Sequence, residues 1–211
     1  MERVDGFIFT ELELLCLASL VGMNRIYGYE YLGSDSLKKD IHYAIYGLAK
    51  KKYIYMEETT DDIHVNSEPI RIFNILKQPQ YVFDVLKEAT NERIIIYKGK
   101  DNESVFVRQN STQCMEVVVG IILSDYIVRF LVDEGYIKYL IKDDLGERRV
   151  IRKNENIRVN NKEDRLLYIK KINEKYNIDD SLRIEIYESC IYDKVKKESL
   201  ELTYKNLQSI F

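Results

Sequence analysis

Two histidines are the residues of this chain best suited by type to metal binding or general-base catalysis. Neither His42 nor His64 has a cysteine or carboxylate at the spacing typical of a zinc site. His64 follows Asp61 and Asp62, which resembles part of a catalytic relay, but such a relay also needs a hydroxyl or thiol nucleophile, and no motif supplies one. We therefore expect surface or turn histidines, and we expect no metal.

Carboxylates are numerous, and adjacent pairs of them are the candidates for acid-base chemistry. Adjacent side chains of a strand point to opposite faces of a sheet, and in a turn both are solvated, so structural roles are favoured. The dispersed glycines form neither a P-loop nor a GxGxxG motif. The sequence thus predicts a protein that is not an enzyme and needs no cofactor. The pairs are Glu57 with Glu58, Asp61 with Asp62, Asp143 with Asp144, and Asp179 with Asp180.

Three separated cysteines, Cys16, Cys114 and Cys190, form neither a disulfide framework nor a CxxC motif. This usage is typical of a reducing compartment, and we expect Cys16 and Cys114 to be core residues. The first residues are charged and include no apolar stretch, so no secretory signal is predicted. The longest apolar run, residues 117–123, is far shorter than the roughly 20 residues that span a bilayer. We expect a cytoplasmic protein without membrane insertion.

The strongest local signal for a function lies in residues 36–66. A helix over 36–51 ends in lysines and is followed by a hairpin, an order that resembles a winged helix. In that interpretation the helix enters the major groove of DNA. The acidic hairpin tip, the absence of Arg and Asn from the helix and a net charge of -3 count against nucleic acid. The residues that would face DNA in this alternative are Lys38, Lys39, His42 and Lys50.

The helices that position these residues follow from capping and periodicity. Thr10 and Glu13 have the spacing of a capping box, which predicts a helix over 10–21, with Gly22 as its left-handed cap. Apolar residues at three- and four-residue spacing predict further helices. These helices cover 36–51, 68–77, 124–134 and 162–176, with Ser36 and Ser124 as N-caps.

Alternating apolar residues predict strands in the rest of the chain. A small hairpin is expected over 53–57 and 61–65. After Pro79 the apolar period changes from 3.6 to 2, which predicts an antiparallel meander. The strands of the meander, and those expected later, cover 81–85, 93–98, 104–109, 113–119, 136–141, 148–152, 182–187 and 199–204.

These elements predict an α+β fold, with an antiparallel β-sheet flanked by helices. The chain has 211 residues, 45% of them hydrophobic, and no Pro-, Gly- or Ser-rich linker, so residues 1–211 are expected to form a single domain. Helices precede strands in each of two halves, 1–120 and 121–211, which suggests a loose duplication. The 17 tyrosines would suit a binding surface, although an AT-rich coding sequence would produce the same composition.

The order of elements also resembles a known family. A helix containing Glu11-Leu12-Glu13-Leu14-Leu15 exits at Val21-Gly22, and the helix over 36–51 closes in Tyr53-Ile54. A helix over 70–77 then ends in Gln78-Pro79, followed by apolar strands at 81–85, 94–97 and 105–107. Over about residues 8–134 this pattern resembles the EspG-like secretion-associated proteins of type VII secretion systems, including shorter relatives in Gram-positive Firmicutes.

The resemblance implies a cytoplasmic, non-enzymatic protein with a central antiparallel sheet flanked by helical bundles. Proteins of that family act as chaperones that hold helical secretion substrates by their hydrophobic tips. The chain is shorter than the better-known members at its C-terminal end and lacks Trp, and no binding residue is carried over from the family. We therefore expect a protein that binds a helical secretion substrate. A winged-helix nucleic-acid-binding protein is the alternative.

Overall fold

The computed structural model describes residues 6–23, 25–29, 37–60, 62–109, 116–137, 165–172, 178–187 and 190–211. Several sequence-based expectations lie outside these residues. They are the cap Ser36, the core position of Cys114, the strand over 148–152 and most of the strand over 136–141.

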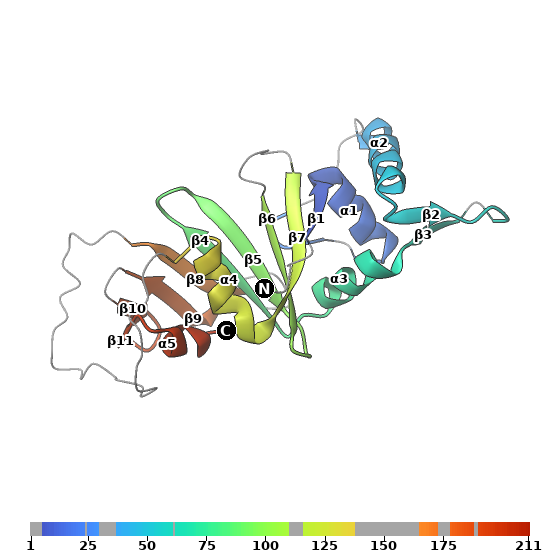
Figure 1. Ribbon diagram of the computed structural model, residues 1–211. Coiled ribbons are helices and arrows are strands. Elements are labelled where there is room, and N and C mark those ends of the chain that lie inside the picture. Colours follow the sequence, from blue (N-terminus) through green and yellow to red (C-terminus); the bar gives the residue numbers. More distant parts are fainter. Residues whose placement is uncertain are drawn as a thin grey trace.

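Nine strands of the described residues form one antiparallel sheet (Figure 1). Their order is β1-β7-β6-β5-β4-β8-β9-β10-β11, so β4 pairs with β5 on one side and with β8 on the other. Strands from both expected halves of the chain therefore share one sheet. The strands are β1 (Gly6–Thr10), β4 (Tyr81–Lys87), β5 (Glu92–Lys98), β6 (Glu103–Gln109), β7 (Glu116–Leu123), β8 (Leu167–Ile172), β9 (Ile178–Ile186), β10 (Cys190–Asp193) and β11 (Glu198–Glu201).

Helices cover both faces of the sheet, and each face has its own hydrophobic core. The central strands are apolar at consecutive positions because they are buried on both faces. In β5, for example, Ile95 and Tyr97 face the first core, while Ile94 and Ile96 face the second. This arrangement confirms the expected α+β fold. The first core is covered by α1 (Glu11–Leu20), α2 (Leu37–Lys50) and α3 (Ser67–Lys77), and the second by α4 (Ile127–Asp133) and α5 (Tyr204–Gln208).

A buried carboxylate joins the first strand to the first two helices. The predicted capping box is present: the Glu13 N–H donates to the Thr10 hydroxyl (3.2 Å), and the Thr10 N–H donates to Glu13 Oε2 (2.7 Å). The same carboxylate, only 4% exposed, accepts from the ammonium of Lys51 at the end of α2 (2.6 Å). It also lies against Gly47, where a Cβ would overlap Glu13 Oε1. We call these residues the Glu13 junction.

The sequence predicts a helix over 162–176, and the structure contradicts it. Leu167–Ile172 instead form β8, paired with β4 and β9. Leu167 and Ile169 face the second core, whereas Ile172 faces the first. One face of β8 is buried at Leu167 and Ile169 and the other at Ile172, so the buried residues Ile169 and Ile172 lie three residues apart, which is the spacing of a helix.

Other differences concern three short elements and the ends of two more. Strands β1 and β10 and helix α5 are not predicted from the sequence. Ser124 does not cap a helix but begins the 3-10 turn η1 (Ser124–Tyr126), which precedes α4. The strand expected over 199–204 ends at Glu201, because the Thr203 hydroxyl accepts from the Asn206 N–H (3.2 Å) and starts α5.

The Glu13 junction predicts an unusual response of α2 to an added methyl group. In an unobstructed helix, Gly→Ala raises stability by about 1 kcal/mol. At Gly47 the new Cβ would collide with the Glu13 carboxylate. We expect Gly47→Ala to lower the free energy of unfolding by about 1–3 kcal/mol, measured by urea denaturation.

The matched control is Ala49→Gly, two residues away on the exposed side of α2. It should lower the free energy of unfolding by only about 1 kcal/mol, through helix propensity alone. A Gly47→Ala protein that is more stable than the parent would show that α1 and α2 do not approach each other in this way.

Candidate functional site

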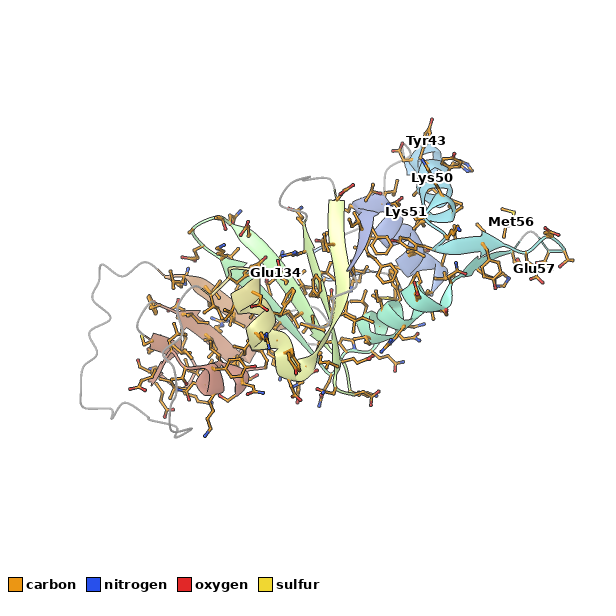
Figure 2. The ribbon with its side chains drawn as sticks, in the orientation of Figure 1. Tyr43, Lys50, Lys51, Met56, Glu57 and Glu134 are labelled. Carbon is orange, nitrogen blue, oxygen red and sulfur yellow. The ribbon has the colours of Figure 1, made fainter. Side chains whose placement is uncertain are left out.

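The outer face of α2 is aromatic. Ala44 and Leu48 on its inner face are buried, whereas Tyr43 and Tyr46 are 77% and 70% exposed. The two tyrosines are three residues apart, so their side chains lie next to each other along the helix. Figure 2 shows Tyr43 on α2 at the end of the molecule opposite β10 and β11.

The hairpin of β2 (Ile54–Met56) and β3 (Ile63–Val65) follows α2 and extends away from the sheet (Figure 1). Its first residue, Ile54, is buried in the first core, whereas Met56, farther along the same face, is 58% exposed. An apolar strip therefore runs from the core out into solvent. The directly opposite residues are Ile54 with Val65, Tyr55 with His64, and Met56 with Ile63. We define the α2–hairpin surface as Tyr43, Tyr46 and Met56; Tyr55 points to the opposite face of the hairpin, where it stacks on His64.

Acidic side chains lie beyond this surface, at the tip of the hairpin. Glu57, Glu58 and Asp62 are exposed, and Asp61 lies outside the described residues. Glu57 Oε2 lies 3.2 Å from His64 Nε2, and the His64 ring stacks on Tyr55, with ring centroids 5.3 Å apart. His64 is thus an exposed hairpin residue, as the sequence predicts. Its carboxylate neighbour comes from the other strand.

The lysines of the winged-helix alternative are only partly described. Lys50 is exposed in the last turn of α2, and Lys38 and Lys39 lie in its first turn, with side chains outside the described part of the structure. The adjacent Lys51 lies at the surface, but its ammonium donates to Glu13 Oε2 (2.6 Å) and to the Ile8 carbonyl (3.1 Å). The positive charge of Lys51 is therefore neutralised within the Glu13 junction. His42 is exposed on α2.

A cleft of about 860 Å³ lies over β4, β5 and β8, beside residues 25–29. Its charged groups are paired: the Arg93 guanidinium donates to both oxygens of Asp84 (2.7 and 2.8 Å), and the Tyr27 hydroxyl donates to Asp84 Oδ2 (3.1 Å). Gly28 has a left-handed φ of 81°, and a Cβ there would lie 2.7 Å from the Ile95 side chain. The absence of a side chain at Gly28 therefore lets this loop pack directly on the sheet.

Two of the tyrosines that line the cleft are held in their protonated form. Burial raises the pKa of Tyr29 and of Tyr136 to about 12, so both phenols are protonated at neutral pH and can donate hydrogen bonds. The described lining residues contain no His, Cys or Ser, and two of the lining carboxylates are ion-paired, Asp84 with Arg93 and Glu134 with Arg108. The cleft is thus a polar, tyrosine-rich surface with internally paired charges.

Cys16 is not an activated nucleophile. It is half-buried in α1, against the first core, which is close to the expected core position. Burial raises the pKa of its thiol, and the nearby negative charge of Glu13 raises it further. The thiolate form, which is the reactive form, is therefore disfavoured.

Sequence reasoning missed two groupings that depend on pairing across strands. The ion pair of Asp84 and Arg93 joins β4 to β5, and the contact of Glu57 with His64 crosses the hairpin. The signal for the second was present, because the expected strands 53–57 and 61–65 bring residues 57 and 64 onto neighbouring strands. The first had no signal, since apolar alternation does not specify which polar residues meet.

Comparisons with known proteins do not assign this chain to a family. No protein-family model matches the chain, and no curated protein matches it significantly. In the described part of the chain, every helix falls short of the length and apolar character needed to cross a bilayer. The α2–hairpin surface and the cleft are therefore interpreted from their own chemistry.

The environment of Cys16 predicts its reactivity. A raised pKa leaves less thiolate at a given pH, so alkylation of Cys16 by iodoacetamide should reach half its maximal rate at a higher pH than alkylation of an exposed thiol. Glu13→Gln should lower that midpoint, because it removes the negative charge while a Gln at this position can still complete a capping box. The rate is measured by mass-spectrometric mapping of the Cys16 peptide. Fast alkylation at neutral pH, or a midpoint that Glu13→Gln leaves in place, would contradict this assignment.

Proposed function

We propose that this protein is a non-enzymatic binding protein that holds a helical protein partner on the α2–hairpin surface. The observation that carries the proposal is the high exposure of Tyr43, Tyr46 and Met56 on two adjoining elements that extend from the sheet (Figures 1 and 2). Isolated exposed apolar residues are common, but a group of them on a projecting edge is typical of an interface. Tyrosine and methionine are both enriched in protein interfaces.

The form of the surface supports a helical partner. Tyr43, Tyr46 and Lys50 follow one another at three- and four-residue steps, which forms a ridge along α2. Such a ridge packs into the groove of a second helix, with anchors at i, i+3 and i+7. The hairpin beside it supplies Met56, a flexible side chain that adapts to different apolar surfaces.

The partner we propose is a helical substrate of a type VII-type secretion system, held in the cytoplasm. The resemblance to EspG-like proteins supports this choice, and the antiparallel sheet flanked by helices is the architecture that the resemblance implies. Covering the apolar tip of a substrate would keep it from self-association until a secretion component competes for it. The protein itself would then need no cofactor.

Several features favour a protein partner over the nucleic acid of the winged-helix alternative. The charge of Lys51 is neutralised by Glu13, and the hairpin that would act as the wing carries Glu57 and Glu58 at its tip. The exposed ridge of α2 consists of Tyr43, Tyr46 and Lys50 and contains neither the Arg nor the Asn that read base edges.

The proposal is tested by capture followed by reconstitution. The tagged full chain captures proteins from the cells that produce it, and each captured protein is then purified and titrated against the chain by calorimetry. Tyr43→Ala combined with Tyr46→Ala should weaken binding of a helical partner by tenfold or more, as expected for central aromatic anchors. Lys38→Glu combined with Lys39→Glu should leave binding unchanged.

Tyr126→Ala is the matched control, since Tyr126 is 50% exposed but lies in η1, away from α2. It should bind the partner as the parent does. A partner whose affinity is the same for all variants would overturn the proposed surface. Saturable binding of duplex DNA that is lost with salt and with the Lys38 and Lys39 substitutions would establish the winged-helix alternative instead.

A further inference from the structure

The tip of the hairpin brings together three potential metal ligands. Glu57 directly follows β2, while Asp62 and His64 lie two residues apart on the returning strand, so their side chains leave the same face. Glu57 is opposite Asp62, because the Glu57 N–H donates to the Asp62 carbonyl (2.9 Å). As a result, one imidazole nitrogen and two carboxylate oxygens lie within 4.8 Å of one another. Figure 2 shows Glu57 at the outer end of the hairpin.

We propose that Glu57, Asp62 and His64 form a binding site for a divalent transition-metal ion of the zinc type. One nitrogen and two oxygen donors suit Zn²⁺, whereas Mg²⁺ and Ca²⁺ prefer sites made of oxygen alone. Three protein ligands leave a fourth position of a tetrahedral ion open to water or to a further ligand. The proposal rests on the hairpin alone and does not depend on the proposed function.

The distances are close to those that zinc requires. Bonds of about 2.0–2.2 Å in a tetrahedron place ligand atoms roughly 3.3–3.6 Å apart. His64 Nε2 and Glu57 Oε2 are already 3.2 Å apart. The Asp62 carboxylate lies within 4.8 Å of both atoms, and a rotamer change of this exposed side chain closes the remaining distance.

Neighbouring side chains orient two of the ligands. The Tyr55 ring stacks on the His64 imidazole at an interplanar angle of 25°, which restricts rotation of the imidazole. The Thr60 hydroxyl donates to Glu57 Oε2 (3.2 Å). Contacts of this kind, just outside the ligands themselves, raise metal affinity by fixing the ligand positions. A bound cation would also offset the repulsion between the two neighbouring carboxylates.

The test is a calorimetric titration of the full chain with Zn²⁺ in a buffer that does not bind metal. We expect saturation at one equivalent, and we expect His64→Gln, Glu57→Gln and Asp62→Asn each to weaken binding by about tenfold or more. The chain offers a matched control for two of these changes. His42→Gln removes the other histidine, and Glu58→Gln removes the adjacent exposed carboxylate, and neither should alter the affinity.

A second readout locates the ion independently. Zn²⁺ should slow amide hydrogen exchange in residues 54–65 of the parent protein, and the effect should be lost in the His64→Gln protein. Circular dichroism checks that each variant remains folded. Three outcomes would each overturn the proposal. The first is the absence of saturable Zn²⁺ binding, and the second is binding that His64→Gln leaves unchanged, as a site at the cysteines would give. The third is Mg²⁺ that competes as effectively as Zn²⁺.

Discussion

The buried carboxylate of Glu13 is the constraint on which the arrangement of the N-terminal layer depends. It accepts from the N–H of Thr10, the N-cap of α1, and from Lys51 at the end of α2, and it occupies the space that a side chain at Gly47 would fill. A buried carboxylate without such partners would be costly, so α1 and α2 can approach closely only in the register that pairs Glu13 with Lys51. That register sets the direction in which Tyr43 and Tyr46 point from α2. It also sets the position at which the hairpin begins.

Lysine 51 connects this junction to the edge of the sheet. Its ammonium also binds the carbonyl of Ile8 in β1, which is an edge strand. Exposed edge strands pair readily with other strands, and a lysine at the edge is one of the devices that prevent this. The same side chain thus neutralises a buried charge and blocks an edge, and it contributes less to a surface for nucleic acid than its position in the sequence suggests.

The sequence predicts best the features that neighbouring residues determine. The capping box of Thr10 and Glu13, the left-handed Gly22 after α1 and the strand pairing of the 53–65 hairpin all involve nearby residues, and all are present. The sequence-based prediction is wrong for β8, which lies between β4 and β9, because its buried residues change face between Ile169 and Ile172 and their spacing then resembles that of a helix. The candidate sites could be predicted from the sequence only in part. The hairpin is predicted, and with it the position of Glu57 and His64 on neighbouring strands, but no local pattern predicts that Asp84 pairs with Arg93.

The strand order also bears on how the chain reaches its fold. β1 is the first strand to be synthesised, but Gly6 pairs with Gly120, and β4 must wait for β8 before its second side is occupied. Pairings so distant in sequence give a high contact order, which slows folding. During translation, the apolar side of β1 and the inner face of α1 remain without their sheet until β7 has left the ribosome. The nascent chain therefore passes through a long interval in which its own apolar surfaces are exposed and open to association.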